Sequence, residues 1–232
     1  MTFSEQLYDQ DIVINDYLTL TFNSSNLFPK LKDQQIIFIA GLSGSGKSTL
    51  LKNLEKNLTH AKAIPERRII TEKGMIQPYA SFFNLKCKFN KREDRIRIVK
   101  NYKKNIPEGI VYVLKNIKIT KDVSSVFIFD GIRGEKELQN VLINFKNAKV
   151  IILGATKQTR LERILERNDP YDLTQNTSNR NVLKIVEDDL SLHGDFKEYK
   201  NKKIFNIDTN TMNQEEVFST AYHWAKKTIK HL

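Results

Sequence analysis

A glycine- and serine-rich segment of eight residues carries the clearest chemistry in this sequence of 232 residues. Residues 41–48 fit the pattern G-x-x-x-x-G-K-[S/T]. In such a loop the glycines let backbone N–H groups turn toward phosphate oxygens, and a helix beginning at its end adds the positive end of its dipole. The segment therefore predicts a cradle for the phosphates of a nucleoside triphosphate. The residues expected to bind the nucleotide here are Gly41, Leu42, Ser43, Gly44, Ser45, Gly46, Lys47, Ser48 and Thr49.

Three side chains have the types needed to hold these phosphates and a divalent cation. The Lys47 ammonium is expected to reach the β- and γ-phosphates, and the Ser48 hydroxyl is expected to ligate Mg²⁺. Asp130 follows the apolar run 126–129, where folds of this kind place the carboxylate that holds magnesium through water. The sequence therefore predicts a bound nucleoside triphosphate with Mg²⁺ as cofactor, Ser48 and Asp130 as metal ligands, and Lys47 and Asp130 as catalytic residues.

Two arginines three residues apart form a second candidate group. Arg160 and Arg163 share one face of an expected helix, opposite its leucines Leu161 and Leu165. Phosphoryl transfer requires positive charge around the moving group and exclusion of water. We therefore predict catalytic roles for both arginines. The alternative is an ordinary solvated Arg/Glu helix face.

Short apolar runs alternate with amphipathic helical patterns along most of the chain. The runs at 36–40, 61–64, 126–129, 150–153 and 204–207 are typical of strands in a parallel sheet that is covered on both faces. This alternation predicts a three-layer α/β fold with about five core strands. Ligands of such sheets bind beyond the carboxyl ends of the strands, where the phosphate cradle and Asp130 fall.

The remaining segments are expected to surround this domain, residues 36–232. Residues 1–35 are predicted to be a strand or hairpin extension, because residues 12–22 alternate between apolar and polar. The polar residues 168–180 are predicted to form a short lid loop, and residues 181–194 a helix that returns from it.

Residues 65–121 are predicted to be a helical insertion with an unusual charge. They hold fifteen Lys and Arg residues against five Asp and Glu residues, which accounts for nearly all of the net charge of +11. Clustered positive charge attracts anionic partners. Within this segment Ile110, Val113, Leu114 and Ile117 have the spacing of a buried helix face.

The cysteine content and the apolar runs also bear on where in the cell the protein is expected. Cys87 is the single cysteine, so no disulfide can form within the chain, and no apolar run approaches the roughly 20 residues of a membrane span. The first residues have neither the basic region nor the apolar block of a secretory signal. We expect a cytoplasmic protein without a membrane partner.

Residues 130–133, Asp-Gly-Ile-Arg, resemble the Asp-Gly-Phe-Pro-Arg element of nucleoside-monophosphate-kinase-like phosphotransferases, shortened by one residue. They are also similar to the Asp-Gly-Ile-Arg form of proteins related to dephospho-CoA kinase and adenylate kinase. The helix with the two arginines resembles the one that leads into the kinase lid. Residues 207–211 resemble the late loop that borders the adenine, which implies nucleotide binding by Asp208 and Asn210.

A closer likeness, over roughly residues 36–215, is to an uncharacterised group of bacterial ATP-binding proteins. Their pattern resembles Pro-x-Arg-Arg-x-(Ile/Leu)-Thr, Asp-Arg, Pro-x-Gly-(Ile/Met) and Asp-Gly-(Ile/Leu)-Arg-Gly. This sequence has the four elements at residues 65–71, 94–95, 107–110 and 130–134.

Monophosphate kinases place their acceptor-binding insertion where this chain has its basic segment. The resemblance therefore implies acceptor binding by Arg67, Arg68 and Arg95, and Arg133 after the Asp-Gly element could also reach the acceptor. A planar guanidinium suits a phosphate group because it can donate two parallel hydrogen bonds. The general base stays open between Glu66 and Asp130.

Other classes of P-loop protein fit less well. Transporter-type ATPases normally have a glutamate after the aspartate, where this chain has Gly131, and GTPases have an Asn-Lys-x-Asp motif that is absent from the sequence. We predict a phosphotransferase that uses Mg²⁺ and takes the γ-phosphoryl group from ATP as donor to a small anionic acceptor, a nucleotide or a nucleotide-like metabolite. The alternatives are an ATPase or regulatory module, or a nucleic-acid end kinase, whose basic segment binds protein or nucleic acid; nucleic acid is not favoured.

Overall fold

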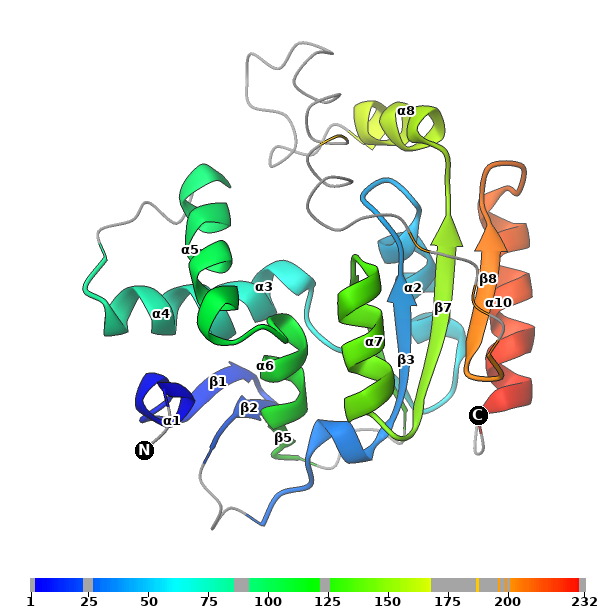
Figure 1. Cartoon of the computed structure of the whole chain (residues 1–232). Coiled ribbons are helices and arrows are strands. Elements are labelled where there is room, and N and C mark those ends of the chain that lie inside the picture. The colour runs from blue at the N-terminus through cyan, green and yellow to red at the C-terminus, as the bar shows by residue number, and fades with distance from the viewer. Residues whose placement is uncertain are drawn as a thin grey trace. The chain divides into compact units, whose positions relative to one another are not determined.

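The computed structural model describes residues 3–22, 27–85, 92–121, 126–167 and 201–229, and the single residues 187, 196 and 199. The chain divides into two compact units, and Figure 1 labels most of their helices and strands. The N-terminal unit takes residues 1–34, 64–124 and 139–147, and the sheet unit takes residues 35–63, 125–138 and 148–232.

The sheet unit contains five parallel strands in the order β4-β6-β3-β7-β8. They are β3 (Gln35–Ala40), β4 (Ala61–Ala63), β6 (Val126–Ile132), β7 (Ala148–Gly154) and β8 (Ile204–Asp208). β6 is buried along its whole length, as expected of a strand covered on both faces. The predicted α/β fold with about five parallel strands is confirmed. Because β3 lies between β6 and β7, the segment after β3 leaves the sheet at a point where the strand order reverses, which is the usual ligand position.

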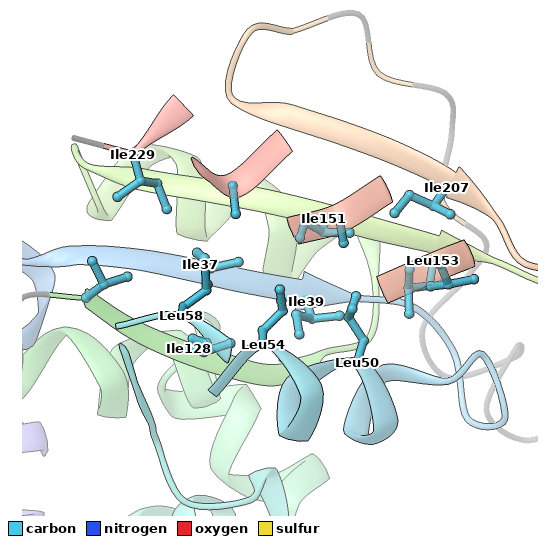
Figure 2. Close-up of a cluster of buried hydrophobic side chains, with 14 residues drawn as sticks. Ile37, Ile39, Leu50, Leu54, Leu58, Ile128, Ile151, Leu153, Ile207 and Ile229 are labelled. Atoms are coloured by element: carbon cyan, nitrogen blue, oxygen red, sulfur yellow. The ribbon is translucent and has the colours of Figure 1, made fainter. Parts of the chain in front are cut away.

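Two helices, α2 (Lys47–Asn57) and α10 (Gln214–Thr228), share an apolar cluster with the sheet. Figure 2 shows Leu50 and Leu54 of α2 pointing toward Ile37 and Ile39 of β3. Each fully buried leucine or isoleucine contributes about 1.5–3 kcal/mol. This packing fixes the first turn of α2, and with it the loop that joins β3 to α2.

Helices also follow β6 and β7, as the sequence predicted. α7 (Glu135–Asn144) buries Leu138 and Val141, and α8 (Lys157–Arg167) buries Ile164. Thr156 caps the start of α8, because the backbone N–H of Thr159 donates to its hydroxyl at 3.2 Å.

The N-terminal unit combines a small antiparallel sheet with short helices. The sheet has the order β1-β2-β5, so the predicted N-terminal hairpin forms and pairs with a strand of the basic segment. Ile117 does not continue the predicted helical stripe: α6 ends at Asn116, and Ile117 begins β5, where Leu20 pairs with it. The elements of this unit are α1 (Phe3–Leu7), β1 (Ile12–Asn15), β2 (Leu18–Leu20), η1 (Leu31–Asp33), α3 (Arg67–Thr71), η2 (Glu72–Ile76, a π-helical turn), α4 (Gln77–Phe82), α5 (Arg92–Asn105), α6 (Ile110–Asn116) and β5 (Ile117–Ile119).

A pair of buried tyrosines ties the start of the chain to this unit. The Tyr8 hydroxyl donates to the Gly74 carbonyl at 2.6 Å, and the hydroxyls of Tyr8 and Tyr102 lie 2.7 Å apart. Burial raises the pKa of both phenols well above its usual value, so both stay neutral. Gly74 also lies close to α6: a Cβ at this position would come within 2.4 Å of the Val113 side chain.

In the described part of the chain, every helix is too short or too polar to span a membrane. The predicted lid loop 168–180 and most of the predicted helix 181–194 lie outside the described residues.

Candidate nucleotide-binding site

The glycine- and serine-rich loop joins the end of β3 to the start of α2, as predicted. Gly46 is the N-terminal cap of α2 and has a φ of 94°, a conformation that favours glycine. The Ser45 hydroxyl is buried in the loop and has no hydrogen-bond partner among the described residues. The exposed Ser48 and Thr49 lie in the first turn of the helix. The loop therefore has the strand–loop–helix setting of a phosphate cradle.

Lys47 lies along this loop and is only 7% exposed. Its ammonium donates to the Leu42 carbonyl at 2.8 Å. This bond holds the cation across the loop, where a phosphate oxygen could take the place of the carbonyl. The role of Lys47 in binding phosphate stays a prediction.

Asp130 lies opposite the first turn of α2, and its Oδ2 atom accepts a hydrogen bond of 2.6 Å from the Ser48 hydroxyl. Asp130 follows the apolar run 126–129, as the sequence showed, but it does not lie beyond the strand, because β6 continues to Ile132. The pairing with β3 shifts there, so that Asp130 and Gly131 lie opposite Ile39 alone. A bulge of this kind re-aims a side chain at the end of a strand, and it explains how Asp130 reaches Ser48.

The Ser48–Asp130 pair fits a magnesium ion. A hydroxyl and a carboxylate are hard oxygen ligands, and Mg²⁺ is usually held by one or two protein oxygens together with substrate phosphates and water. The Ser48 hydroxyl oxygen and Asp130 Oδ2 lie 2.6 Å apart, beside the phosphate loop.

Arg133 directly follows β6, which ends at Ile132. Its backbone N–H donates to Glu137 Oε2 at 3.2 Å. Glu137 is 4% exposed and was not singled out from the sequence. In the sequence Glu137 is recognisable just as an acidic residue in the first turn of a helix. Such residues are too common there to identify a functional group.

Arg160 is buried rather than part of a solvated face, with 3% of its surface exposed. Its backbone lies against the phosphate loop: a Cβ added to Gly44 would come within 2.6 Å of the Arg160 carbonyl oxygen. The structure thus brings this predicted catalytic residue to the loop.

Arg163 points to a different partner. Its guanidinium donates to the Thr209 hydroxyl at 2.9 Å and to the Thr209 carbonyl at 2.6 Å. The predicted nucleotide-binding residues Asp208 and Asn210 flank Thr209. Both are exposed, and Asn210 donates its backbone N–H to the Asp208 carboxylate at 2.9 Å.

A pocket of about 320 Å³ opens at the carboxyl ends of β7 and β8. Leu42 of the phosphate loop, Arg160 and Asp208 all line it, with apolar walls from Ile152 and Leu153. Apolar walls with a few polar groups are typical of small-molecule sites, and the volume lies at the lower end of their usual range. The pocket connects the phosphate loop with the loop after β8.

The predicted acceptor-binding arginines 67, 68 and 95 belong to the N-terminal unit. Arg67 and Arg68 begin α3, and Arg68 is exposed. Arg95 of α5 forms an ion pair with Glu72 at 2.7 Å, so part of its guanidinium is already bound within this unit. Acceptor binding by these residues stays a prediction.

The strand order, the loop after β3 and the Ser48–Asp130 pair define a P-loop protein with a three-layer α/β fold. A family model described as an AAA domain (AAA_18) matches residues 37–187, and the chain belongs to this P-loop family. Membership implies nucleotide binding. The predicted membership of the P-loop superfamily is confirmed.

Solved structures of two kinases are similar to this chain. A sugar kinase from Janibacter sp. HTCC2649 is 12% identical, with a TM-score of 0.50 over 85% of this chain and 99% of that one. A gluconokinase from Sinorhizobium meliloti 1021 is also 12% identical, with a TM-score of 0.46 over 86% of this chain and 95% of that one. At such identity the likeness to the sugar kinase shows the fold alone. No curated protein matches this sequence.

The close approach of Gly44 to Arg160 can be tested by substitution. Gly44 has a φ of 83°, and a Cβ there would lie 2.6 Å from the Arg160 carbonyl oxygen. Gly44→Ala is therefore expected to lower the free energy of unfolding by about 1–3 kcal/mol and to weaken nucleotide binding. Chemical denaturation and titration with ATP measure the two effects. Gly154→Ala is the control, since its Cβ would make only an ordinary contact of 3.7 Å; equal stability of the two variants would contradict the prediction.

Proposed function

We propose that this protein transfers the γ-phosphoryl group of ATP, in the presence of Mg²⁺, to a small anionic acceptor that is a nucleotide or a nucleotide-like metabolite. The observation that carries the proposal is the pocket shared by Leu42, Arg160 and Asp208. It provides one continuous surface for the triphosphate, at Leu42, and for the nucleoside, at Asp208. A buried arginine lies between them.

The residues around this pocket have distinct roles in the proposal. Backbone N–H groups of the loop and the Lys47 ammonium would bind the β- and γ-phosphates. Ser48 and Asp130 would hold Mg²⁺, which when bound neutralises phosphate charge. Arg160 is only 3% exposed, so water competes little with its charge. In such surroundings a fixed cation stabilises the charge of the transition state more strongly than it would in water.

The transfer itself needs few groups. An acceptor oxygen forms a bond to the γ-phosphorus while the bond to the β–γ bridging oxygen breaks, and ADP leaves. If the attacking oxygen belongs to a phosphate, it is already largely ionised near neutral pH, because the second pKa of a phosphate monoester is about 6. The reaction then needs no strong general base, which suits a nucleotide-like acceptor.

Turnover with and without acceptors tests this function. We expect ADP release from ATP and Mg²⁺ to be slow alone and to rise when the correct nucleotide or phosphorylated metabolite is added. With γ-labelled ATP, the label should appear in the acceptor. Label recovered only as inorganic phosphate with every acceptor, at a constant rate, would favour an ATPase instead.

The acceptor-binding prediction is tested with arginines of the N-terminal unit. If Arg68 contacts an acceptor phosphate, Arg68→Ala should lower kcat/KM for the acceptor by roughly ten- to a hundredfold, because one charge-assisted hydrogen bond is lost. The affinity for ATP should stay unchanged. Arg95→Ala should act similarly, with some loss of stability because Glu72 loses its partner.

Arg97→Ala is the matched control, since Arg97 lies on the same helix as Arg95 and pairs with Asp94 on the exposed surface. Normal acceptor kinetics in the Arg68 and Arg95 variants would remove them from the acceptor site. If these variants instead showed a smaller salt dependence of oligonucleotide binding, the basic segment would be a nucleic-acid surface.

A further inference from the structure

We infer that Arg163 is a positioning residue that fixes the loop after β8 and so determines binding of the nucleobase, rather than a group that binds the phosphates. The inference rests on the proposed nucleotide binding in this pocket. It does not depend on which acceptor is used, or on phosphoryl transfer itself.

The first observation is the geometry of the arginine. Its two terminal nitrogens donate to one residue, at 2.9 Å to the Thr209 hydroxyl and at 2.6 Å to the Thr209 carbonyl. The planar guanidinium is well suited to such a double contact, and much of its donor capacity is used in it. A phosphate would have to displace Thr209 to take these two donors.

Thr209 is in turn fastened to the sheet. It is 2% exposed, and both its backbone N–H and its hydroxyl donate to the Gly154 carbonyl, at 2.8 Å and 2.9 Å. Gly154 and Asp208 are the last residues of β7 and β8 and pair with each other. Arg163 therefore connects α8 to the point where these two strands end.

Asn210 makes a second connection to the same helix. Its side-chain oxygen accepts from the Thr156 backbone at 2.7 Å and from the Thr159 hydroxyl at 3.1 Å. Asn210 thus holds the loop to the start of α8, and Thr209 holds it to Arg163, about one turn further along the helix. Asp208, whose carboxylate accepts from the Asn210 backbone, is placed by these contacts, and it lines the pocket.

The two arginines of α8 consequently serve different ends of the ligand. Arg160 lines the pocket, and its backbone contacts the phosphate loop at Gly44. Arg163 holds the loop that carries Asp208 through its two hydrogen bonds to Thr209. Losing Arg163 should therefore disturb contacts to the base and leave contacts to the phosphates intact.

Titrations that compare a nucleotide with inorganic tripolyphosphate, which has no base, test this division. In the wild type we expect ATP to bind more tightly than tripolyphosphate. Arg163→Ala should weaken ATP binding by roughly ten- to thirtyfold, reduce the preference among ATP, GTP, CTP and UTP, and leave tripolyphosphate binding unchanged. Arg163→Lys should restore only part of the affinity, since lysine lacks the planar fork.

Two further variants separate this role from general destabilisation. Glu162→Ala changes an exposed neighbour on the same helix and should bind all ligands normally. Thr209→Val removes one acceptor of Arg163 and should act in the same direction, with effects that are not additive in the double variant.

Each result bears on a different claim. A loss of tripolyphosphate binding in Arg163→Ala as large as the loss of ATP binding would make Arg163 a phosphate ligand and overturn the inference. Unchanged affinities and base preference would overturn it as well. Failure of the wild type to bind ATP would remove nucleotide binding at this site altogether. Normal ATP binding without transfer to any acceptor would remove only the proposed phosphotransferase activity.

Discussion

Lys47→Ala is expected to reduce kcat/KM for ATP by roughly a hundredfold or more. A charge-assisted hydrogen bond contributes about 1.5–3 kcal/mol, and the lysine of this motif contacts both the β- and the γ-phosphate. The fold should persist, because the Lys47 ammonium donates to the Leu42 carbonyl within its own loop and is not part of the apolar cluster that joins α2 to the sheet. Calorimetric titration with ATP and Mg²⁺, followed by turnover assays, measures the loss.

A lysine elsewhere on the same helix provides the control for this prediction. Lys52 is exposed on α2, so Lys52→Ala removes an equal charge without touching the loop. It should retain affinity and turnover. If Lys47→Ala bound and turned over ATP as well as Lys52→Ala, the phosphate-binding role of the loop would have to be abandoned.

Asp130→Asn is expected to slow turnover by at least about tenfold and to raise the Mg²⁺ concentration needed for half-maximal activity. The amide keeps the size of the side chain, and its oxygen can still accept from Ser48, so packing and thermal stability should hardly change. What is lost is the negative charge that would hold the cation. Turnover measured as a function of Mg²⁺ concentration at fixed ATP separates this effect from nucleotide affinity.

Ser48→Ala completes a double-mutant cycle with Asp130→Asn. If the two oxygens share one cation, their effects should be coupled by about 0.5–3 kcal/mol. A pair that merely stabilises the start of α2 would show normal Mg²⁺ dependence in both single variants. Coincident magnesium titrations for wild type and Asp130→Asn would therefore reduce Asp130 to a structural partner of Ser48.

Local patterns were enough to predict the phosphate loop and most of the sheet. The loop is specified within eight consecutive residues, whose glycines and lysine act through their own backbone and side chains. The buried strands likewise appear as short continuous apolar runs, because a strand covered on both faces needs apolar residues at every position. For this reason the parallel sheet, its flanking helices and Lys47 could be placed before the structure was known.

The contacts that define the site depend on residues far apart in the chain. The bulge that re-aims Asp130 arises from the register of β6 against β3, and no residue of β6 alone signals it. Arg163 donates to Thr209, which lies 46 residues later in the chain. The two residues meet because β7 and β8 are neighbouring strands.

The N-terminal hairpin also depends on a contact between segments that are far apart in the chain. Its alternating pattern predicted the strands β1 and β2, but their partner β5 lies about 100 residues later in the chain. Periodicity specifies which face of an element is apolar, and it contains nothing about which other element covers that face. The sequence by itself determined the phosphate loop and the strands that carry it. The tertiary structure decided which arginine lines the pocket and which one holds the loop after β8, because that depends on how distant segments meet.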